Sequence, residues 1–358
     1  MGIARGIFMV DNHVIPHSSS GVPGDDPEKL LLYHMDKYGV DVAVLKSHGG
    51  YYAPEGADRN KLIVEMVERH PDRFVALCTD VETQRKEASG EVEWNIDNAV
   101  RELDEALATG LYAAIGEGFP RDRDIRKKMV GWDQRLEEIC KVLDLCRKYK
   151  KPLHWITGGA IGSFRWNADM TRNIIHPENF ENASPLLSME VAAWYPDVPI
   201  ILSHGGIEGS GYYMDFYDKA VYAAACCRNI FLDTGQWWAE LYEKPLKDVN
   251  IGAEKLLWGT GMGQGFLTQQ WMPGEVPETY NAPNLKEYMK YPHMKNIWGW
   301  SLMQLGRLNI PQCDMDLIMG GNAVHLFNIK TPLPAEQLFK MVERDYQTAK
   351  VPPPRFPS

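Results

Sequence analysis

Short apolar runs alternate with amphipathic segments along this chain, and this alternation limits its possible folds more than any other feature. The amphipathic segments have helical spacing, as in residues 60–69, where Leu62, Ile63, Met66 and Val67 lie on one side. Strands that alternate with helices form βα units around a parallel sheet. Eight runs are expected to be strands: residues 7–10, 40–45, 74–77, 111–116, 152–156, 198–202, 230–232 and 256–258.

Side chains that bind metals or move protons follow several of these runs. Asp11 and His13 come after the first run, one residue apart, and side chains at that spacing share a face of a strand. Glu117, His154 and His204 lie at the ends of the fourth, fifth and sixth runs. In an α/β barrel the carboxyl ends of the strands meet at one mouth, where active sites lie. The sequence therefore predicts an enzyme with an α/β barrel and a polar site at its mouth.

The composition is that of an ordinary globular protein, with 44% hydrophobic and 24% charged residues. The net charge of −10 argues against binding to nucleic acid or to an acidic membrane surface. No apolar stretch approaches the roughly 20 residues of a membrane span, and the N-terminus lacks the pattern of a signal peptide. The six cysteines show no CxxC spacing and are expected to be reduced. We therefore expect a cytoplasmic protein with a small-molecule substrate and with no nucleic-acid or membrane partner.

The chain is expected to form one domain without a linker. Residues 1–345 are assigned to the barrel, and residues 346–358, which contain three consecutive prolines, to an extended tail. Two long segments, residues 156–183 and 261–296, follow strands and are rich in Gly, Pro, Asn and Trp. Loops of that length in a compact domain are usually lids or binding loops.

Seven short motifs occur along the chain in a characteristic order. They are Asp11-Asn12-His13-Val14-Ile15-Pro16, Arg69-His70-Pro71-Asp72-Arg73-Phe74, Ile115-Gly116-Glu117, Pro152-Leu153-His154, Ser203-His204-Gly205-Gly206, Trp258-Gly259-Thr260 and Gly320-Gly321-Asn322-Ala323-Val324-His325-Leu326-Phe327. Together they resemble one branch of the amidohydrolase superfamily, which contains aminocarboxymuconate-semialdehyde decarboxylase, the resorcylate-type decarboxylases and related hydrolases. The resemblance covers about Phe8 to Phe327 and implies a distorted (β/α)8 (TIM) barrel with a divalent metal at its C-terminal mouth. Because members of this branch are commonly dimers, a homodimer is expected.

Matched residue by residue, the resemblance assigns Asp11 and His13 to the pair of metal ligands on the first strand, and His154 to the ligand on the fifth. His204 matches a histidine that in this branch is often a catalytic acid–base. Glu117 ends the fourth strand, where some superfamily members place a carboxylate that bridges two metals. The expected cofactor is one or two divalent ions, with zinc favoured and iron or manganese as alternatives.

The sequence departs from the family pattern at the end of the eighth strand. The family has an aspartate there that binds the metal and handles a proton, whereas this chain has Gly261. The missing ligand is expected to come from Glu117, from His204 or from Asp233 at the end of the seventh strand, and Asp233 is also a candidate catalytic residue. The alternative is that the metal has been lost and that the site works on histidines alone. Retention of His13 and His154 favours a metal.

Several further residues are expected to bind the substrate. His48 lies in a Ser-His-Gly-Gly tetrapeptide like the one that carries His204, and an arginine in the first long segment is suited to a carboxylate. Aromatic residues in the segments expected at the mouth indicate an apolar or aromatic substrate with an acyl or carboxyl group. The substrate-binding candidates are His48, Trp155, Arg165, Trp237 and Trp238.

The favoured function is hydrolysis by a metal-activated water, with His204 moving the proton. The alternative is non-oxidative decarboxylation of an aromatic or unsaturated acid, which the missing aspartate disfavours, and a third possibility is an inactive barrel that only binds. The site residues also have structural interpretations. Asp11 would cap a loop, Glu117 would pair with an arginine, His154 would be a core histidine and His204 a residue of a turn.

Overall fold

The structure is a computed structural model that describes most of the chain. It covers residues 7–16, 27–46, 59–93, 95–117, 132–157, 184–207, 214–235, 237–263 and 297–331. The substrate-binding candidates His48 and Arg165 lie outside the described residues, as do the expected tail and most of the two long segments. The expected boundary between barrel and tail at residue 345 is therefore still a prediction.

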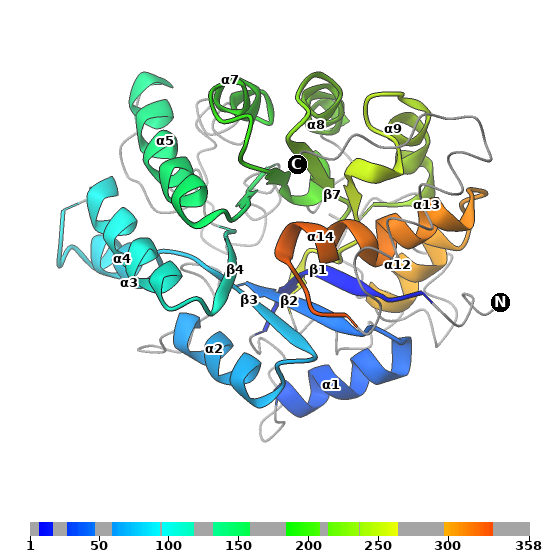
Figure 1. Ribbon diagram of the computed structural model, residues 1–358, viewed down its shortest axis with the longest axis horizontal. Coiled ribbons are helices and arrows are strands. Elements are labelled where there is room, and N and C mark those ends of the chain that lie inside the picture. The colour runs from blue at the N-terminus through cyan, green and yellow to red at the C-terminus, as the bar shows by residue number, and fades with distance from the viewer. Residues whose placement is uncertain are drawn as a thin grey trace, which may run out of the picture.

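A single parallel sheet forms the centre of the molecule (Figure 1). Its strand order is β8-β7-β6-β5-β4-β3-β2-β1-β9. The last two strands in the chain, β8 and β9, belong to the stretch 256–263, and they pair with β7 and β1 respectively, which closes the sheet. The strands are β1 (Val10–Ile15), β2 (Val42–Lys46), β3 (Phe74–Cys78), β4 (Tyr112–Ile115), β5 (Leu153–Trp155), β6 (Ile200–Leu202), β7 (Ile230–Asp233), β8 (Leu256–Leu257) and β9 (Met262–Gly263).

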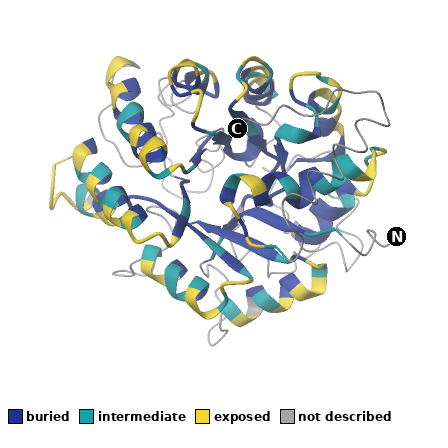
Figure 2. Cartoon of the chain, viewed as in Figure 1, coloured by how far each residue is buried: buried dark blue, intermediate teal, exposed yellow. Residues whose placement is uncertain are grey.

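Helices connect the strands and surround them, so the predicted (β/α)8 TIM barrel is confirmed. Figure 2 shows that the helices bury the sides that face the strands and expose the opposite sides. No described helix has both the length and the apolar character needed to span a membrane. The main helices are α1 (Pro27–Tyr38), α2 (Arg59–Arg69), α3 (Val81–Ser89), α4 (Ile96–Ala108), α5 (Trp132–Tyr149), α7 (Leu186–Trp194), α8 (Met214–Cys226), α9 (Glu243–Lys247), α12 (Ile297–Leu305), α13 (Gln312–Asp316) and α14 (Asn322–Phe327).

The first strand differs from the expectation. It was expected over residues 7–10, but β1 begins at Val10, so Asp11 and His13 lie inside it rather than after its end. The physical reason is cross-strand pairing. The backbone N–H of Asn12 donates to Trp258 O at 3.1 Å, and the N–H of Gly261 donates to His13 O at 3.2 Å. These bonds continue the sheet through the polar residues Asp11–His13, although the end of the apolar run at residue 10 predicts the end of the strand.

The interior of the barrel contains an apolar layer. Alternate strand residues point inward, and those of six strands meet α14 in one hydrophobic cluster. The strand members are Val10, Val42, Val44, Leu77, Ala114, Ile201 and Leu257, and the members from α14 are Ala323, Val324 and Phe327. The same alternation places the next inward side chains, at the carboxyl ends of the strands, above this layer.

Candidate metal centre

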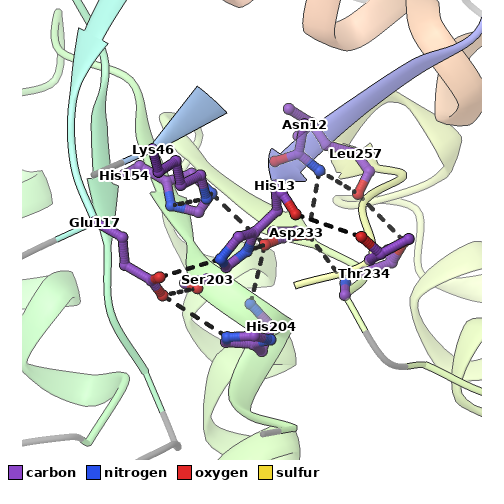
Figure 3. A network of polar contacts seen from close by, with 12 residues as sticks. Asn12, His13, Lys46, Glu117, His154, Ser203, His204, Asp233, Thr234 and Leu257 are labelled. Carbon is purple, nitrogen blue, oxygen red and sulfur yellow. Dashed lines mark hydrogen bonds and ion pairs between the residues drawn. The ribbon is translucent and has the colours of Figure 1, made fainter. Parts of the chain in front are cut away.

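His13 of β1 lies at the centre of a buried polar cluster above the apolar layer (Figure 3). Its Nδ1 is 2.6 Å from Oδ2 of Asp233, which ends β7. Its Nε2 is 3.1 Å from Oε2 of Glu117, which follows β4. The ring centroids of His154 and His204 lie 5.2 Å and 4.6 Å from that of His13. The structure therefore brings together five of the six residues predicted for metal binding and catalysis.

Asp233 is held by hydrogen bonds on both carboxylate oxygens. The side-chain amide of Asn12 and the backbone N–H of Gly235 donate to Oδ1 at 3.1 Å and 2.9 Å. His13 Nδ1 contacts Oδ2, and the backbone N–H of His204 donates to the same atom at 3.2 Å. His154 Nε2 is 3.6 Å from Oδ2. Asp233 thus connects the three histidines of the cluster and fixes their relative positions.

His204 lies on the short helical turn Ser203–Gly206 that follows β6, and it has a positive φ of 57°. Its backbone carbonyl accepts a hydrogen bond of 2.8 Å from Nε1 of Trp237. Its Nε2 is 3.7 Å from Oε1 of Glu117, and the Ser203 hydroxyl donates to that same oxygen. The turn therefore directs the His204 ring toward Glu117 and His13.

Two overlapping groups of side chains have ligand atoms close enough to share one metal ion. His13, His154 and Asp233 form the first group, and His13, Glu117 and His204 form the second, with ligand atoms within 4.8 Å of one another in each. His204 Nδ1 is buried and has no hydrogen-bond partner among the described residues, whereas His13 Nε2 faces the Glu117 carboxylate at 3.1 Å. A buried nitrogen atom without a partner is unfavourable, and a divalent ion would satisfy it. The imidazole and carboxylate donors also suit zinc, iron or manganese, so the residues fit a metal.

Lys46 is a residue of this cluster that the sequence analysis missed. It ends β2, and because Val42 and Val44 face the interior, alternation directs Lys46 there as well. The side chain is fully buried, and its Nζ lies 2.7 Å from Nδ1 and 2.9 Å from Nε2 of His154. A charged residue that ends a continuous apolar strand was the available signal in the sequence.

The cations and anions of the cluster shift one another's pKa values. Burial and Lys46 lower the pKa of His13, but the carboxylates of Glu117 and Asp233 outweigh them and raise it to about 9. Burial lowers the pKa of Lys46 to about 8, although Glu117 and Asp233 act in the other direction. Burial and the charge of His13 lower the pKa of His204 to about 3. At neutral pH His13 and Lys46 are therefore cations, and His204 is a neutral ring.

The pKa values of the other three ionisable groups, His154, Glu117 and Asp233, are also shifted by burial and by neighbouring charges. Burial lowers the pKa of His154 well below its usual range, and the Lys46 ammonium lowers it further. Burial opposes ionisation of Glu117 and Asp233, but the nearby His13 outweighs burial and holds both pKa values well below the usual range. The cluster without metal thus contains two carboxylates that are balanced by the charges of His13 and Lys46.

Asp11 is not brought into either group of candidate ligands. Its Oδ1 accepts hydrogen bonds from the backbone N–H groups of His13 and Thr260, at 3.0 Å and 3.1 Å. Its Oδ2 accepts from the Thr260 hydroxyl at 2.9 Å and from Nε1 of Trp298 at 2.6 Å. Four protein donors therefore occupy the carboxylate. They favour a structural role in which Asp11 joins β1 to Thr260 and Trp298, rather than the expected capping of a loop.

The three tryptophans that were expected to bind substrate are buried in the hydrophobic core. Trp155 follows His154 directly in β5, so it points to the opposite face of the sheet, away from the cluster. Trp237 packs edge-on against Tyr217 and Tyr242, with ring centroids 5.3 Å away in each case. Because Trp237 also bonds to the His204 carbonyl, it supports the site from behind.

Gly261 occupies the position where an aspartate was expected, and the structure shows what takes the space. A Cβ atom added to Gly261 would lie 2.4 Å from Cε1 and 2.5 Å from Nδ1 of His204. Gly261 also has a positive φ of 65°, which L side chains rarely adopt. The His204 ring therefore fills the place beside the eighth strand, and Asp233 supplies a carboxylate from the neighbouring strand β7.

The comparisons with known proteins agree with this geometry. A model of the amidohydrolase family matches residues 23–329, which is most of the chain. The chain belongs to the amidohydrolase family. Members of the amidohydrolase superfamily are enzymes that use divalent metals, and this amidohydrolase has two candidate ligand groups at the expected end of its barrel. Among curated proteins, none matches the sequence.

Solved structures of other amidohydrolases share the fold at low sequence identity. 5-Carboxyvanillate decarboxylase from Novosphingobium aromaticivorans, complexed with manganese, is 10% identical with a TM-score of 0.50, over 92% of this chain and 98% of that chain. An amidohydrolase from Burkholderia multivorans with bound zinc is 8% identical with a TM-score of 0.50, over 90% and 100%. A protein described as amidohydrolase II is 13% identical with a TM-score of 0.51, over 89% and 99%. At these identities the likeness shows the fold alone.

Proposed function

We propose that this amidohydrolase is a metal-dependent hydrolase of a small apolar or aromatic molecule that carries an acyl or carboxyl group. The observation that carries the proposal is the convergence of three imidazoles and two carboxylates, from five strands or the residues that directly follow them, in one buried cluster. The apolar character of the substrate is inferred from the aromatic residues of the segments 156–183 and 261–296. The carbonyl or carboxyl group is inferred from the amidohydrolase fold.

The second ligand group, His13, Glu117 and His204, is the one that we propose holds the ion. It contains the buried Nδ1 of His204, which has no hydrogen-bond partner among the described residues. Its His204 ring is neutral at physiological pH, and a neutral imidazole is the form that binds metals. When bound, a divalent ion would supply activation of a water molecule and polarisation of the substrate carbonyl. Zinc is the favoured ion, with iron and manganese as alternatives.

Asp233 has two tasks in this proposal. By accepting a hydrogen bond from His13 Nδ1, it fixes the His13 tautomer and leaves Nε2 to face Glu117 and His204. The charge of His13 holds its pKa well below the usual range, so it is an ionised carboxylate in the metal-free cluster. A neutral, metal-bound His13 would no longer hold that pKa down, and Asp233 would then be able to accept a proton from the attacking water. The second of these is a task that the resemblance gives to the aspartate that Gly261 replaces.

Decarboxylation is a second candidate that one observation favours. The absence of an aspartate at position 261 was the main argument against it, and Asp233 provides a carboxylate that contacts His13 at 2.6 Å. In such a reaction Asp233 would again be the group that handles the proton. The two reactions differ in their products, so an assay separates them.

Metal analysis with product analysis tests the proposal. We expect the purified protein to contain divalent metal, and the metal-loaded protein to hydrolyse members of a panel of aromatic lactones and aryl esters. Carbon dioxide release from a panel of hydroxybenzoates, without hydrolysis, would support decarboxylation instead. Asp233→Asn should lower turnover by about 100-fold or more in either case. A protein that binds no divalent ion at micromolar concentrations would refute both metal mechanisms.

A further inference from the structure

The turn Ser203–Gly206, which carries His204, has a backbone that needs support. Three successive residues are in the left-handed region, with φ of 57° at His204, 50° at Gly205 and 84° at Gly206. Glycine adopts this conformation readily, but for histidine it is unfavourable. Contacts from outside the turn must therefore hold His204 in place.

Thr157 contacts both ends of this turn. It lies two residues after β5, is fully buried, and the pairing of Trp155 with Leu202 places it beside the turn. Its hydroxyl donates to the backbone carbonyl of Ser203, and the backbone N–H of Gly206 donates to the same hydroxyl at 3.2 Å. A threonine hydroxyl has one hydrogen to donate and lone pairs that accept. A single side chain therefore spans the turn from its first residue to its last.

The side chains of the turn point at one carboxylate (Figure 3). The Ser203 hydroxyl donates to Oε1 of Glu117, and Nε2 of His204 is 3.7 Å from the same oxygen. The ring centroid of His204 is also 4.6 Å from that of His13, whose Nε2 faces Oε2 of Glu117 at 3.1 Å. The orientation of the turn thus sets both the carboxylate and an imidazole of the proposed ligand group.

Two other contacts limit the turn. A Cβ atom added to Gly205 would lie 2.4 Å from the ring of Trp237, and one added to Gly206 would lie 2.4 Å from the backbone of Phe216 in α8. The turn is therefore confined on the sides of Trp237 and α8, and the hydroxyl of Thr157 fixes it on the side of β5.

We propose that Thr157 is a positioning residue that holds the Ser203–Gly206 turn and thereby directs the Ser203 hydroxyl and the His204 ring toward Glu117. Because its hydroxyl contacts backbone atoms of the turn, it acts through Ser203 and His204 rather than on a substrate or an ion. This inference rests on the proposed function, in which Glu117 and His204 hold the ion. It goes further in naming a residue of the neighbouring strand that sets their geometry.

Removal of the hydroxyl tests the proposal. Thr157→Val keeps the shape of the side chain but removes the donor and the acceptor, whereas Thr157→Ser keeps both. The first measurement is the position of the proton and nitrogen NMR signals of the His204 ring in metal-free protein, assigned by their absence in His204→Asn. Thr157→Val should shift these signals, and Thr157→Ser should leave them near the wild-type positions.

The second measurement is zinc binding to metal-depleted protein, by competition with a chromophoric chelator. Thr157→Val should weaken binding by about 10- to 100-fold, as expected for loss of a partner that orients the ligands. Thr157→Ser should stay within about threefold of the wild type, because it can make the same hydrogen bonds. If Thr157→Val does not fold, as judged by circular dichroism, Thr157→Ala replaces it, since Thr157→Ala and Thr157→Ser differ from each other by the hydroxyl alone.

Thr83→Val is the matched control for loss of a buried threonine hydroxyl. Thr83 lies on α3, is buried, and its hydroxyl donates to the backbone carbonyl of Asn98 at 3.4 Å. This variant should have a lower melting temperature, with unchanged His204 signals and zinc affinity. A purely structural Thr157 would behave in the same way when replaced.

The outcomes are distinguishable. Unshifted His204 signals and unchanged zinc binding in Thr157→Val, or equal effects of Thr157→Val and Thr157→Ser, would overturn the positioning role and leave the metal-dependent function intact. Failure of the wild-type protein to bind any divalent ion would instead remove the proposed function, whereas the ring signals, measured without metal, would still decide whether Thr157 holds the turn. Effects that appear in Thr157→Val and not in Thr157→Ser support the inference without any measurement of activity.

Discussion

Two buried carboxylates, Asp11 and Asp233, contact His13 in different ways, and this difference separates structural from chemical roles at the scale of single residues. Asp233 bonds to the His13 ring, whereas Asp11 bonds to its backbone N–H and is otherwise occupied by Thr260 and Trp298. Metal binding by the His13 ring should depend on the contact with Asp233 and not on the contact with Asp11. Replacement of each aspartate by asparagine should therefore affect a different property, metal affinity for Asp233 and stability for Asp11.

Asp233→Asn should lower metal affinity by about 10- to 100-fold, because it removes the carboxylate that orients His13. Asp11→Asn should leave metal affinity within about threefold of the wild type. It should lower the free energy of unfolding by about 1–3 kcal/mol, because its amide would leave a buried donor unpaired. Chelator competition and thermal unfolding of both variants check this. Loss of metal in Asp11→Asn would restore Asp11 as a ligand.

The titration of His13 predicts how the stability of the metal-free protein varies with pH. Its pKa is raised from an ordinary 6.5 to about 9, so the folded state retains a proton that the unfolded chain loses. The resulting stabilisation is fully present below pH 6.5 and is lost as the pH rises toward 9. His13 alone would lower stability by about 1 kcal/mol per pH unit between pH 7 and 8, below the pKa of about 8 of Lys46. Near pH 6.5 the lowered pKa values of His154 and His204 offset this fall, because the unfolded chain still binds protons at both rings. Below pH 6.5 His204 acts in the opposite sense, because its folded pKa of about 3 is depressed.

The melting temperature in the presence of a chelator, measured at pH 6.5, 7.25 and 8, checks this dependence. The variant His13→Asn is the control, since it cannot take up the proton, and its melting temperature should vary less over this interval. An unchanged slope in His13→Asn would show that another group is responsible.

At the scale of elements, the turn after β6 and the end of the eighth strand share one space. Gly261→Ala would place a methyl group 2.4 Å from the His204 ring and would also strain a backbone with φ of 65°. Gly90→Ala is a matched control, because Gly90 has φ of 80° but no atom within 4 Å of an added Cβ. Strain alone should cost Gly90→Ala about 1–2 kcal/mol, and overpacking should cost Gly261→Ala about 1–3 kcal/mol more. Metal affinity should fall only in Gly261→Ala. Equal effects on both properties in the two variants would argue against this packing.

The elements also show what the sequence can and cannot predict. The alternation of apolar runs was sufficient for the barrel, because a parallel strand that is buried on both faces has a continuous apolar pattern. The start of β1 was misplaced, since hydrogen bonds to Trp258 and Gly261 from the far end of the sheet determine it. The inward direction of Lys46 could have been predicted, because the alternation that places Val42 and Val44 inside the barrel also applies to position 46. The contact of Asp11 with Trp298 depends on tertiary packing and has no local signal in the sequence.

At the scale of the whole molecule, the cluster depends on closure of the barrel. His13 and Asp233 are 220 positions apart in the chain, yet they form a 2.6 Å contact because β1 and β7 lie on either side of the stretch that contains β8 and β9. An opening between β1 and β9 would separate His13 from Asp233 of β7. The expected homodimer stays a prediction, which sedimentation equilibrium would check.

Because the proposed ligands come from β1, from the segment after β4 and from the turn after β6, a bound ion would connect segments that are far apart in the chain. An ion that binds only the folded chain stabilises it by about 4 kcal/mol at a concentration 1,000 times its dissociation constant. We therefore expect saturating zinc to raise the melting temperature by several degrees and excess chelator to reverse the rise. Glu117→Gln should lose most of this shift, whereas Asp11→Asn should start from a lower temperature and retain it. A zinc-dependent shift of the same size in Glu117→Gln would mean that the ion binds elsewhere, since that variant has lost a ligand of the proposed group.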